Sequence, residues 1–263
     1  MTTTPTAPRP AVVYPDLVGK VAVVTGGSRG IGAATATALA ASGAAVCVVG
    51  RDQPAIDTVV AGIARTGGQA IGVAADCTAE ADLAALASDV HDRLGPADIV
   101  CAFAGGDGMP VPSREESAAH WRAVVDSELT SAFLTISAFL PDMADGRGGA
   151  IVTMASAAAR QPGGSSAAYA AGKAGVIALT RHLAKELAGE GVRVNCVSPS
   201  AIENDKMRAR MSSQDRLTLG AAFPLGRIGQ PHDVAAAALF LASDASSWIT
   251  GITLDVAGGK VMG

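Results

Sequence analysis

The chain has 263 residues, of which 49% are hydrophobic, 17% are charged and 3% are aromatic. This composition is typical of a folded globular protein of one or two domains and excludes an intrinsically disordered chain. The net charge of −4 does not attract a phosphate backbone, so we expect no nucleic-acid partner. No uncharged apolar run reaches the roughly 20 residues that span a bilayer, so we expect no membrane partner either.

The N-terminus and the cysteines indicate the cellular compartment. Residues 1–16 are rich in Thr and Pro and lack the apolar core of a secretory signal, which predicts a disordered tail followed by one domain over residues 17–263. The four cysteines lie far apart without a C-x-x-C pair, and the four histidines show no zinc-ligand spacing. We therefore predict free buried thiols, no metal site and a cytoplasmic protein.

Short apolar runs alternate with longer Ala-rich segments along the chain. Seven nearly continuous apolar runs are predicted as strands buried on both faces, namely Val21–Thr25, Ala45–Val49, Ala70–Ala74, Ile99–Ala102, Ala150–Met154, Arg193–Val197 and Ile252–Val256. Helices are predicted at about 30–42, 53–66, 79–94, 115–143, 166–189 and 231–243. This alternation predicts an α/β fold with a single doubly wound, Rossmann-type parallel sheet of about seven strands and helices on both faces. Segment 199–224 breaks the pattern after a strand and is expected to form a substrate lid.

A glycine-rich loop, T-G-G-S-R-G-I-G, joins the first predicted strand to the first predicted helix. Its glycines Gly26, Gly30 and Gly32 permit a tight turn and a close approach of the backbone to a pyrophosphate. The N–H groups at the start of the next helix would then face this anion. With 31 glycines in the chain, the spacing alone is a weak signal. Its position at the first strand-to-helix junction is what indicates dinucleotide binding.

The end of the second predicted strand bears on the choice of dinucleotide. An acid there binds the ribose 2′-OH of NAD, whereas a basic neighbour accommodates the 2′-phosphate of NADP. Gly50 takes the acidic position, Arg51 follows it and Arg29 lies in the glycine loop, so two guanidiniums could bind one phosphate. NADP(H) is therefore favoured. NAD(H) remains possible if Asp52 is the acid, displaced by a residue or two.

A Tyr-x-x-x-Lys pair occurs once, as Tyr169 and Lys173, in a chain with two tyrosines and five lysines. Chance would give such a pair only about 0.04 times. The spacing places both side chains on one helical face, where a cation makes a phenol more acidic and so a better proton donor and acceptor. Ser156, after the fifth predicted strand, could hydrogen-bond a substrate oxygen held against the tyrosine. The alternative is a surface tyrosine, a solvated lysine and a helix-capping serine.

Taken together, these motifs resemble the short-chain dehydrogenase/reductase family, and within it the 3-oxoacyl-carrier-protein-reductase-like members. The resemblance runs from about Leu17 to Gly259, with T-G-G-S-R-G-I-G similar to the family's T-G-x-x-x-G-x-G and Y-A-A-G-K to its Y-x-x-x-K. It implies that Ser156, Tyr169 and Lys173 are catalytic. The C-terminal segments P-L-G-R-I-G-Q-P-H-D-V-A and W-I-T-G-I-T-L-D-V-A-G-G also match the family and imply a homotetramer.

The sequence and this resemblance also predict a set of cofactor contacts. Asp76 matches the acid that contacts the adenine amine, and Cys77 would contribute its backbone. The full predicted set is Gly26, Ser28, Arg29, Gly30, Ile31, Gly32, Arg51, Asp76, Cys77, Ala104, Gly105, Tyr169, Lys173, Pro199 and Ile202.

The chain departs from the family pattern at four places. A-F-A-G replaces N-N-A-G at Ala102–Gly105, Pro199-Ser200 replaces a Pro-Gly turn, and Asn204 replaces a threonine near the nicotinamide carboxamide. Most consequentially, Glu128 stands where the family has an asparagine that opens a helix kink and holds a water of the proton relay. We therefore include Glu128 among the candidate catalytic residues and expect it to form an ion pair with Lys173.

The sequence thus predicts an NADP(H)-dependent oxidoreductase that transfers a hydride between nicotinamide and a small carbonyl or secondary alcohol substrate, such as a 3-oxoacyl thioester or another ketone. Tyr169 would be the general acid in reduction and the base in oxidation, with Lys173 holding the nicotinamide ribose and Ser156 polarising the substrate oxygen. Two alternatives stay open: an NAD-dependent alcohol dehydrogenase on the same site, and a non-catalytic dinucleotide-binding protein. Loops 106–114 and 157–165 and segment 199–224 should form the substrate pocket.

Overall fold

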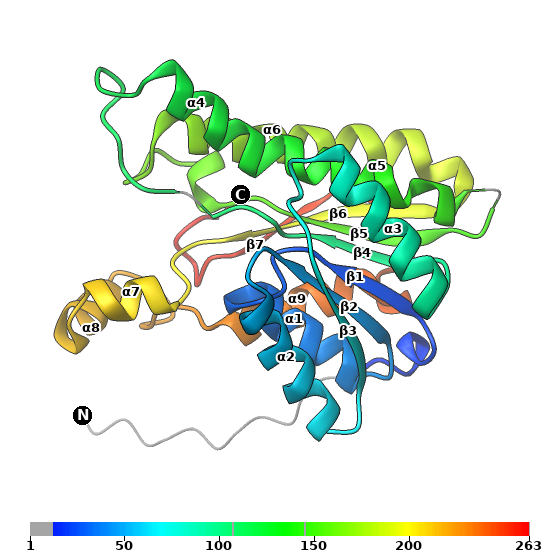
Figure 1. Ribbon diagram of the computed structural model, residues 1–263. Helices are drawn as coiled ribbons and strands as arrows, with labels where there is room; N and C mark the ends of the chain where they lie inside the picture. The colour runs from blue at the N-terminus through cyan, green and yellow to red at the C-terminus, as the bar shows by residue number, and fades with distance from the viewer. Residues whose placement is uncertain (1–12, 107, 145, 263) are drawn as a thin grey trace.

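The computed structural model describes residues 13–106, 108–144 and 146–262. Its centre is a seven-stranded sheet in the order β3-β2-β1-β4-β5-β6-β7, with all neighbours parallel (Figure 1). The strands are β1 (Val21–Val24), β2 (Ala45–Gly50), β3 (Gln69–Ala74), β4 (Ile99–Ala102), β5 (Gly149–Met154), β6 (Val192–Pro199) and β7 (Thr253–Val256). All seven predicted strands are confirmed, with ends displaced by at most two residues.

Alternating side chains along the strands build a core on each face of the sheet. In β1, Ala22 and Val24 pack with one helical layer, whereas Val21 and Val23 pack with the other. The first layer holds α1 (Gly30–Ala41), α2 (Gln53–Arg65) and α9 (Pro231–Ala242), and the second holds α3 (Glu80–Leu94), α5 (Ser131–Met143) and α6 (Ala167–Glu186) (Figure 1). The predicted doubly wound sheet with helices on both faces is therefore confirmed.

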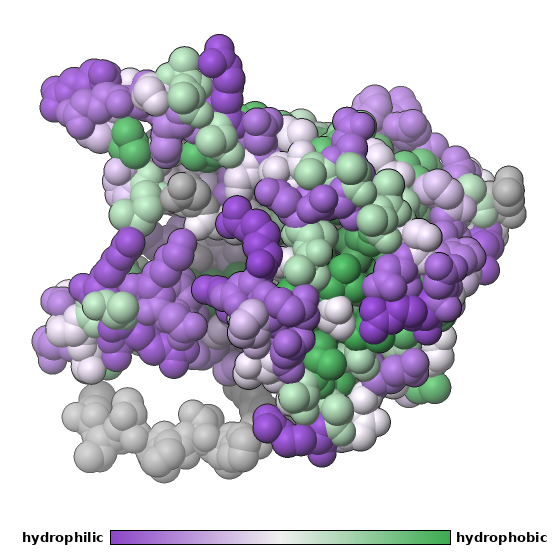
Figure 2. All heavy atoms as spheres, in the orientation of Figure 1, coloured by the Kyte–Doolittle hydropathy of each residue, from purple (hydrophilic) through white to green (hydrophobic). Residues whose placement is uncertain are grey.

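The strand order places the ligand crevice. β1 lies between β2 and β4, and in sheets of this kind ligands bind outside the carboxyl ends of the strands where the order reverses. Segment 199–224 leaves β6 at this end and contains two short helices, α7 (Asp205–Arg210) and α8 (Ser213–Ala221). These helices and the loop before α4 project as two arms, and the surface between them is hollowed (Figure 2).

The single helix predicted over 115–143 is wrong, because the structure has three elements there. α4 (Ala118–Val125) begins after Ser117, whose Oγ accepts a hydrogen bond from the backbone N–H of His120 at 3.1 Å. A π-helical turn, η2 (Asp126–Thr130), then separates α4 from α5. A π turn holds one more residue than an α turn, so side chains change direction there. Glu128, at the centre of η2, is 1% exposed.

The domain begins before residue 17. Residues 1–12 lie outside the described residues, but Tyr14 packs against the core and Pro15–Leu17 form a 3₁₀ turn, η1. Asp16 Oδ2 accepts a hydrogen bond from the backbone N–H of Asp244 at 2.8 Å. The predicted tail boundary at residue 16 is therefore wrong for these residues, because the apolar surface of Tyr14 and Leu17 extends the fold.

All four cysteines are free and buried, as predicted: Cys47, Cys77, Cys101 and Cys196. Burial raises the pKa of Cys77 to about 11 and that of Cys101 to about 12. Thiolates are the reactive form, so we expect no thiol of the native protein to react rapidly with Ellman's reagent at pH 8, and all four to react in denaturant. Rapid stoichiometric reaction of the native protein would contradict this burial.

Candidate active site

The glycine loop between β1 and α1 is closed on one side and open on the other. Gly26 has φ +64°, and a Cβ there would lie 2.6 Å from the carbonyl oxygen of Phe103. A Cβ at Gly32 would strike the carbonyl oxygen of Gly26. Gly30 has φ +55° and faces open space. Gly26 and Gly32 therefore pack the turn against its surroundings, and Gly30 leaves room for a ligand.

The start of α1 can receive an anion. Its N-cap residue, Arg29, makes no side-chain hydrogen bond to the helix, and the first turn carries no acid. The first N–H groups and the positive end of the helix dipole therefore remain available to a phosphate. The residues present thus fit the pyrophosphate of a dinucleotide.

Thr25 is a structural residue of this site that the sequence analysis did not select. Its Oγ1 accepts hydrogen bonds from the backbone N–H groups of Phe103 at 3.0 Å and Ala104 at 3.2 Å. These bonds fix the segment after β4 that carries Ala104 and Gly105. The sequence could have indicated this role, because Thr25 is the polar residue that ends an apolar run and starts the glycine motif.

Arg29 and Arg51 were expected to bind the 2′-phosphate of NADP together, but the structure gives Arg29 another partner. Arg29 Nη2 forms an ion pair with Asp52 Oδ2 at 2.7 Å, and Asp52 Oδ1 also caps α2 by accepting from the N–H of Ala55. Arg51 is exposed. The Thr78 N–H and hydroxyl hydrogen-bond Asp76, and these bonds, with the charge of Arg51, hold the pKa of Asp76 below its usual value. Arg29 therefore already has an anionic partner.

Tyr169 and Lys173 lie on the first turns of α6. Ser166 caps this helix through a hydrogen bond from the N–H of Tyr169 to Ser166 Oγ at 3.2 Å. Lys173 Nζ lies 5.8 Å from the centroid of the Tyr169 ring and donates a hydrogen bond to the carbonyl oxygen of Met154 at 2.9 Å. The lysine is thus fixed between the phenol and the end of β5.

The expected ion pair between Glu128 and Lys173 is present and buried. Glu128 Oε2 lies 2.8 Å from Lys173 Nζ, and Glu128 Oε1 accepts a hydrogen bond from the N–H of Gly106 at 2.6 Å. A Cβ at Gly105 would lie 2.5 Å from Oε2, so only glycine leaves room for the carboxylate. Burial lowers the pKa of Lys173, but the charges of Glu128 and Tyr169 outweigh it and raise that pKa overall. Lys173 is therefore a cation at neutral pH.

Ser156 follows β5 by two residues and caps a 3₁₀ turn, η3 (Ala157–Ala159). Its Oγ accepts a hydrogen bond from the N–H of Ala158 at 3.2 Å. This uses one acceptor site of the hydroxyl, whose O–H can still donate to a substrate oxygen. Capping and a catalytic hydrogen bond are therefore compatible at this residue.

The Tyr169 ring lies against the loop that follows β4. A Cβ at Gly108 would lie 3.2 Å from Tyr169 Cζ, so the backbone of this loop packs against the phenol ring. Across the crevice, Asn204 caps α7 by accepting a hydrogen bond from the N–H of Met207 at 2.8 Å. The amide at this departure from the family pattern is thus already used within the chain.

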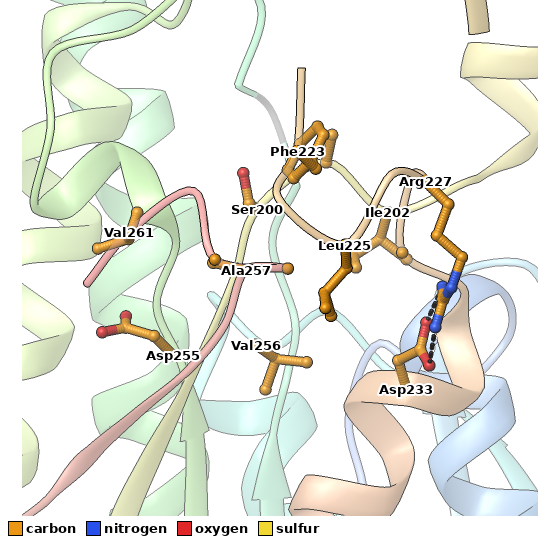
Figure 3. Close-up of a pocket in the computed structure, with 14 residues that line it drawn as sticks. Ser200, Ile202, Phe223, Leu225, Arg227, Asp233, Asp255, Val256, Ala257 and Val261 are labelled. Atoms are coloured by element: carbon orange, nitrogen blue, oxygen red, sulfur yellow. Dashed lines mark hydrogen bonds and ion pairs between the residues drawn. The ribbon is translucent and has the colours of Figure 1, made fainter. Parts of the chain in front are cut away.

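A separate pocket of about 390 Å³ lies between the segments after β6 and β7 (Figure 3). Ser200 and Ile202 line it together with Phe223 and Val261. Arg227 closes one side through a two-armed ion pair with Asp233, at 2.6 and 2.8 Å. Of the predicted site residues only Ile202 lines this pocket, so the pocket does not contain the catalytic residues.

The family model described as Enoyl-(Acyl carrier protein) reductase matches residues 26–260. The chain belongs to the short-chain dehydrogenase/reductase family. It is 40% identical over 250 residues to a 3-oxoacyl-[acyl-carrier-protein] reductase from Synechocystis, with 94% of this chain and 98% of the relative covered. It is 39% identical over 240 residues to a cis-4-hydroxycyclohexanecarboxylate dehydrogenase from Sinomonas cyclohexanicum, covering 91% and 96%.

A solved 7α-hydroxysteroid dehydrogenase, complexed with NADH and 7-oxo glycochenodeoxycholic acid, has the same fold. The two structures align with a TM-score of 0.88 and 35% sequence identity, covering 95% of this chain and 97% of the other. This short-chain dehydrogenase/reductase is therefore an enzyme that uses a nicotinamide dinucleotide and interconverts C=O and CH–OH groups.

The Glu128–Lys173 pair makes a prediction about pH. In Glu128→Asn the carboxylate no longer opposes the field of the Lys173 charge at the Tyr169 oxygen, so the oxidative limb of the pH–rate profile should move to lower pH. We expect the variant to remain active. The measurement is kcat for alcohol oxidation across pH 6 to 10.

Asp126→Asn is the matched control, because it removes an exposed carboxylate from the same π turn. Its profile should be unchanged. An unchanged limb in Glu128→Asn would refute the electrostatic role, and complete loss of activity would instead make Glu128 an obligatory proton carrier.

Proposed function

We propose that this enzyme is an NADP(H)-dependent ketone reductase and secondary-alcohol dehydrogenase whose proton donor and acceptor is Tyr169. One observation carries the proposal: a buried lysine cation, paired with Glu128, is fixed beside the Tyr169 ring at the carboxyl end of the sheet. The open glycine loop and the uncapped start of α1 lie at this same end. The bound nicotinamide supplies or accepts the hydride.

The chain's own residues handle the proton. In reduction the Ser156 hydroxyl donates a hydrogen bond to the substrate carbonyl, and the Tyr169 hydroxyl transfers its proton to the same oxygen. In oxidation the ionised Tyr169 takes that proton back. Lys173 stabilises the phenolate through its charge, while Glu128 and the Met154 carbonyl hold two of the three ammonium hydrogens. The third is then free to hydrogen-bond the ribose of the cofactor.

NADP(H) is the proposed cofactor because Gly50 leaves the acidic position empty and Arg51 is exposed beside it. The ion pair of Arg29 with Asp52 is also largely exposed, and such pairs contribute only about 0–1 kcal/mol. A phosphate could therefore draw Arg29 away from Asp52 at little cost. NAD(H) is the second candidate, because Asp52 follows the end of β2 by two residues and the solved relative contains NADH.

Exposed apolar surface supports the proposed homotetramer. Trp248, just before the edge strand β7, is 99% exposed, and Phe133 on α5 is 47% exposed. The run Ala118–Met143 is long and apolar enough to cross a membrane by length and composition alone, but the buried apolar side chains of its α5 part pack on the sheet. We propose that its outer face contacts another subunit. Free buried cysteines support the proposed cytoplasmic location.

Removing the transferable proton tests the proposed acid. Tyr169→Phe keeps the aromatic ring, and turnover should fall by about 10²–10⁴, which is the usual contribution of general acid–base catalysis. Binding of NADPH should persist, because Lys173 and the glycine loop are unchanged. Tyr14→Phe, at the only other tyrosine, is the control and should leave turnover unaffected. Full turnover by Tyr169→Phe would show that another group donates the proton.

Removing the exposed guanidinium of Arg51 tests the proposed preference for NADP(H) over NAD(H). Arg51→Ala should weaken NADPH binding by roughly ten- to a hundredfold, which corresponds to one charge-assisted contact, and should leave NADH binding nearly unchanged. Arg65→Ala, at the far end of α2, is the control and should change neither. Fluorescence titration with each cofactor measures the dissociation constants of NADPH and NADH. Equal affinity of the unaltered protein for NADPH and NADH would contradict the proposal.

A further inference from the structure

One arginine reaches across the crevice and, within the described part of the chain, has no carboxylate partner. Arg210, the last residue of α7, donates from Nη1 to the thioether sulfur of Met109 at 2.8 Å. Met109 lies in the loop after β4 and is 45% exposed. A thioether is a weak acceptor, whereas a guanidinium carries five donors. This contact therefore leaves most of the binding capacity of Arg210 unused.

The two other arginines of segment 199–224 are neutralised within the chain. Arg208 lies near Glu203 and Asp205, and Arg216 pairs with Glu203 at 3.6 Å. Among the residues that the structure describes, no ion pair involves Arg210 or Lys206. These two exposed side chains are four residues apart on α7 and so share one face of the helix. α7 thus presents uncompensated positive charge, although the whole chain carries −4.

This positive charge is connected to the catalytic tyrosine by a short path. Gly108 packs against the Tyr169 ring, Met109 is the next residue, and its sulfur contacts Arg210. Bond lengths along this path place the guanidinium no more than about 16 Å from Tyr169 Cζ. A substrate whose carbonyl oxygen meets Tyr169 could therefore reach Arg210 with its far end.

We propose that Arg210 binds a carboxylate on the substrate, so that the enzyme acts on ketones and secondary alcohols that carry a carboxylate within about 16 Å of the reacting carbon. This inference rests on the proposed function and adds the substrate class. On binding, the weak N–H···S contact with Met109 is exchanged for charge-assisted hydrogen bonds, which planar guanidinium and carboxylate groups form in pairs. Lys206 adds a longer-range attraction that salt screens.

The test compares keto acids with their own methyl esters, which differ only in the charge that Arg210 would bind. The probes are 4-oxocyclohexanecarboxylate and 7-oxo glycochenodeoxycholic acid, each paired with its ester and measured for kcat/KM with NADPH and NADH. At least one acid should be preferred over its ester by about tenfold or more. Arg210→Gln should remove that preference by lowering kcat/KM for the acid far more than for the ester, whereas Arg208→Gln, the control on the same helix, should keep it. Equal use of acid and ester, or a preference that survives in Arg210→Gln, would overturn the proposal.

Binding without turnover separates this inference from the proposed function. Calorimetric titration of the oxidised-cofactor complex with each acid and ester should show tighter binding of an acid, which Arg210→Gln abolishes. Such binding without turnover of any probe would support the carboxylate site and count against the proposed reaction. Turnover of the esters without tighter binding of either acid would support the reaction and overturn the carboxylate site.

Discussion

Two opposite charges are buried beside the phenol of Tyr169, and the site depends on keeping them paired. The side chains of Lys173 and Glu128 are 3% and 0% exposed, and taking each charge out of water costs several kcal/mol. Their 2.8 Å contact offsets this cost only with further hydrogen bonds, which Met154 and Gly106 provide. Apolar residues of similar volume are often at least as stabilising as such a pair. Its value here is that it holds a cation beside a phenol.

The Glu128 carboxylate contacts both Lys173 and the loop that packs against the Tyr169 ring. Glu128 Oε1 holds the N–H of Gly106, and two residues later Gly108 packs against the Tyr169 ring. The π turn makes this possible, because it turns Glu128 inward between α4 and α5, and the buried side chains of α5 pack on the sheet. A change at Glu128 should therefore affect both the electrostatic field at the phenol and the position of the loop beside it.

The sequence was sufficient for features that depend on neighbouring residues. Nearly continuous apolar runs predicted the strands, and the i, i+4 spacing placed Tyr169 and Lys173 on one helical face. The sequence was insufficient for the π turn η2, because one extra residue per turn interrupts a helix without changing its apolar content. It also missed contacts that depend on how distant loops meet, such as Arg29 with Asp52 and Arg210 with Met109, whose partners lie 23 and 101 positions apart.

The charge of Glu128 tests most directly whether the buried ion pair with Lys173 exists. Infrared difference spectroscopy on protein labelled with ¹³C at glutamate carboxyls, with Glu128→Gln as the reference, reports whether this one group is a carboxylate or a carboxylic acid. The buried ion pair of Glu128 with Lys173 predicts a carboxylate signal at pH 7 that is absent from Glu128→Gln. A carbonyl band of a protonated acid at pH 7 would contradict it, because Lys173 would then face no negative charge and the buried ion pair would not exist.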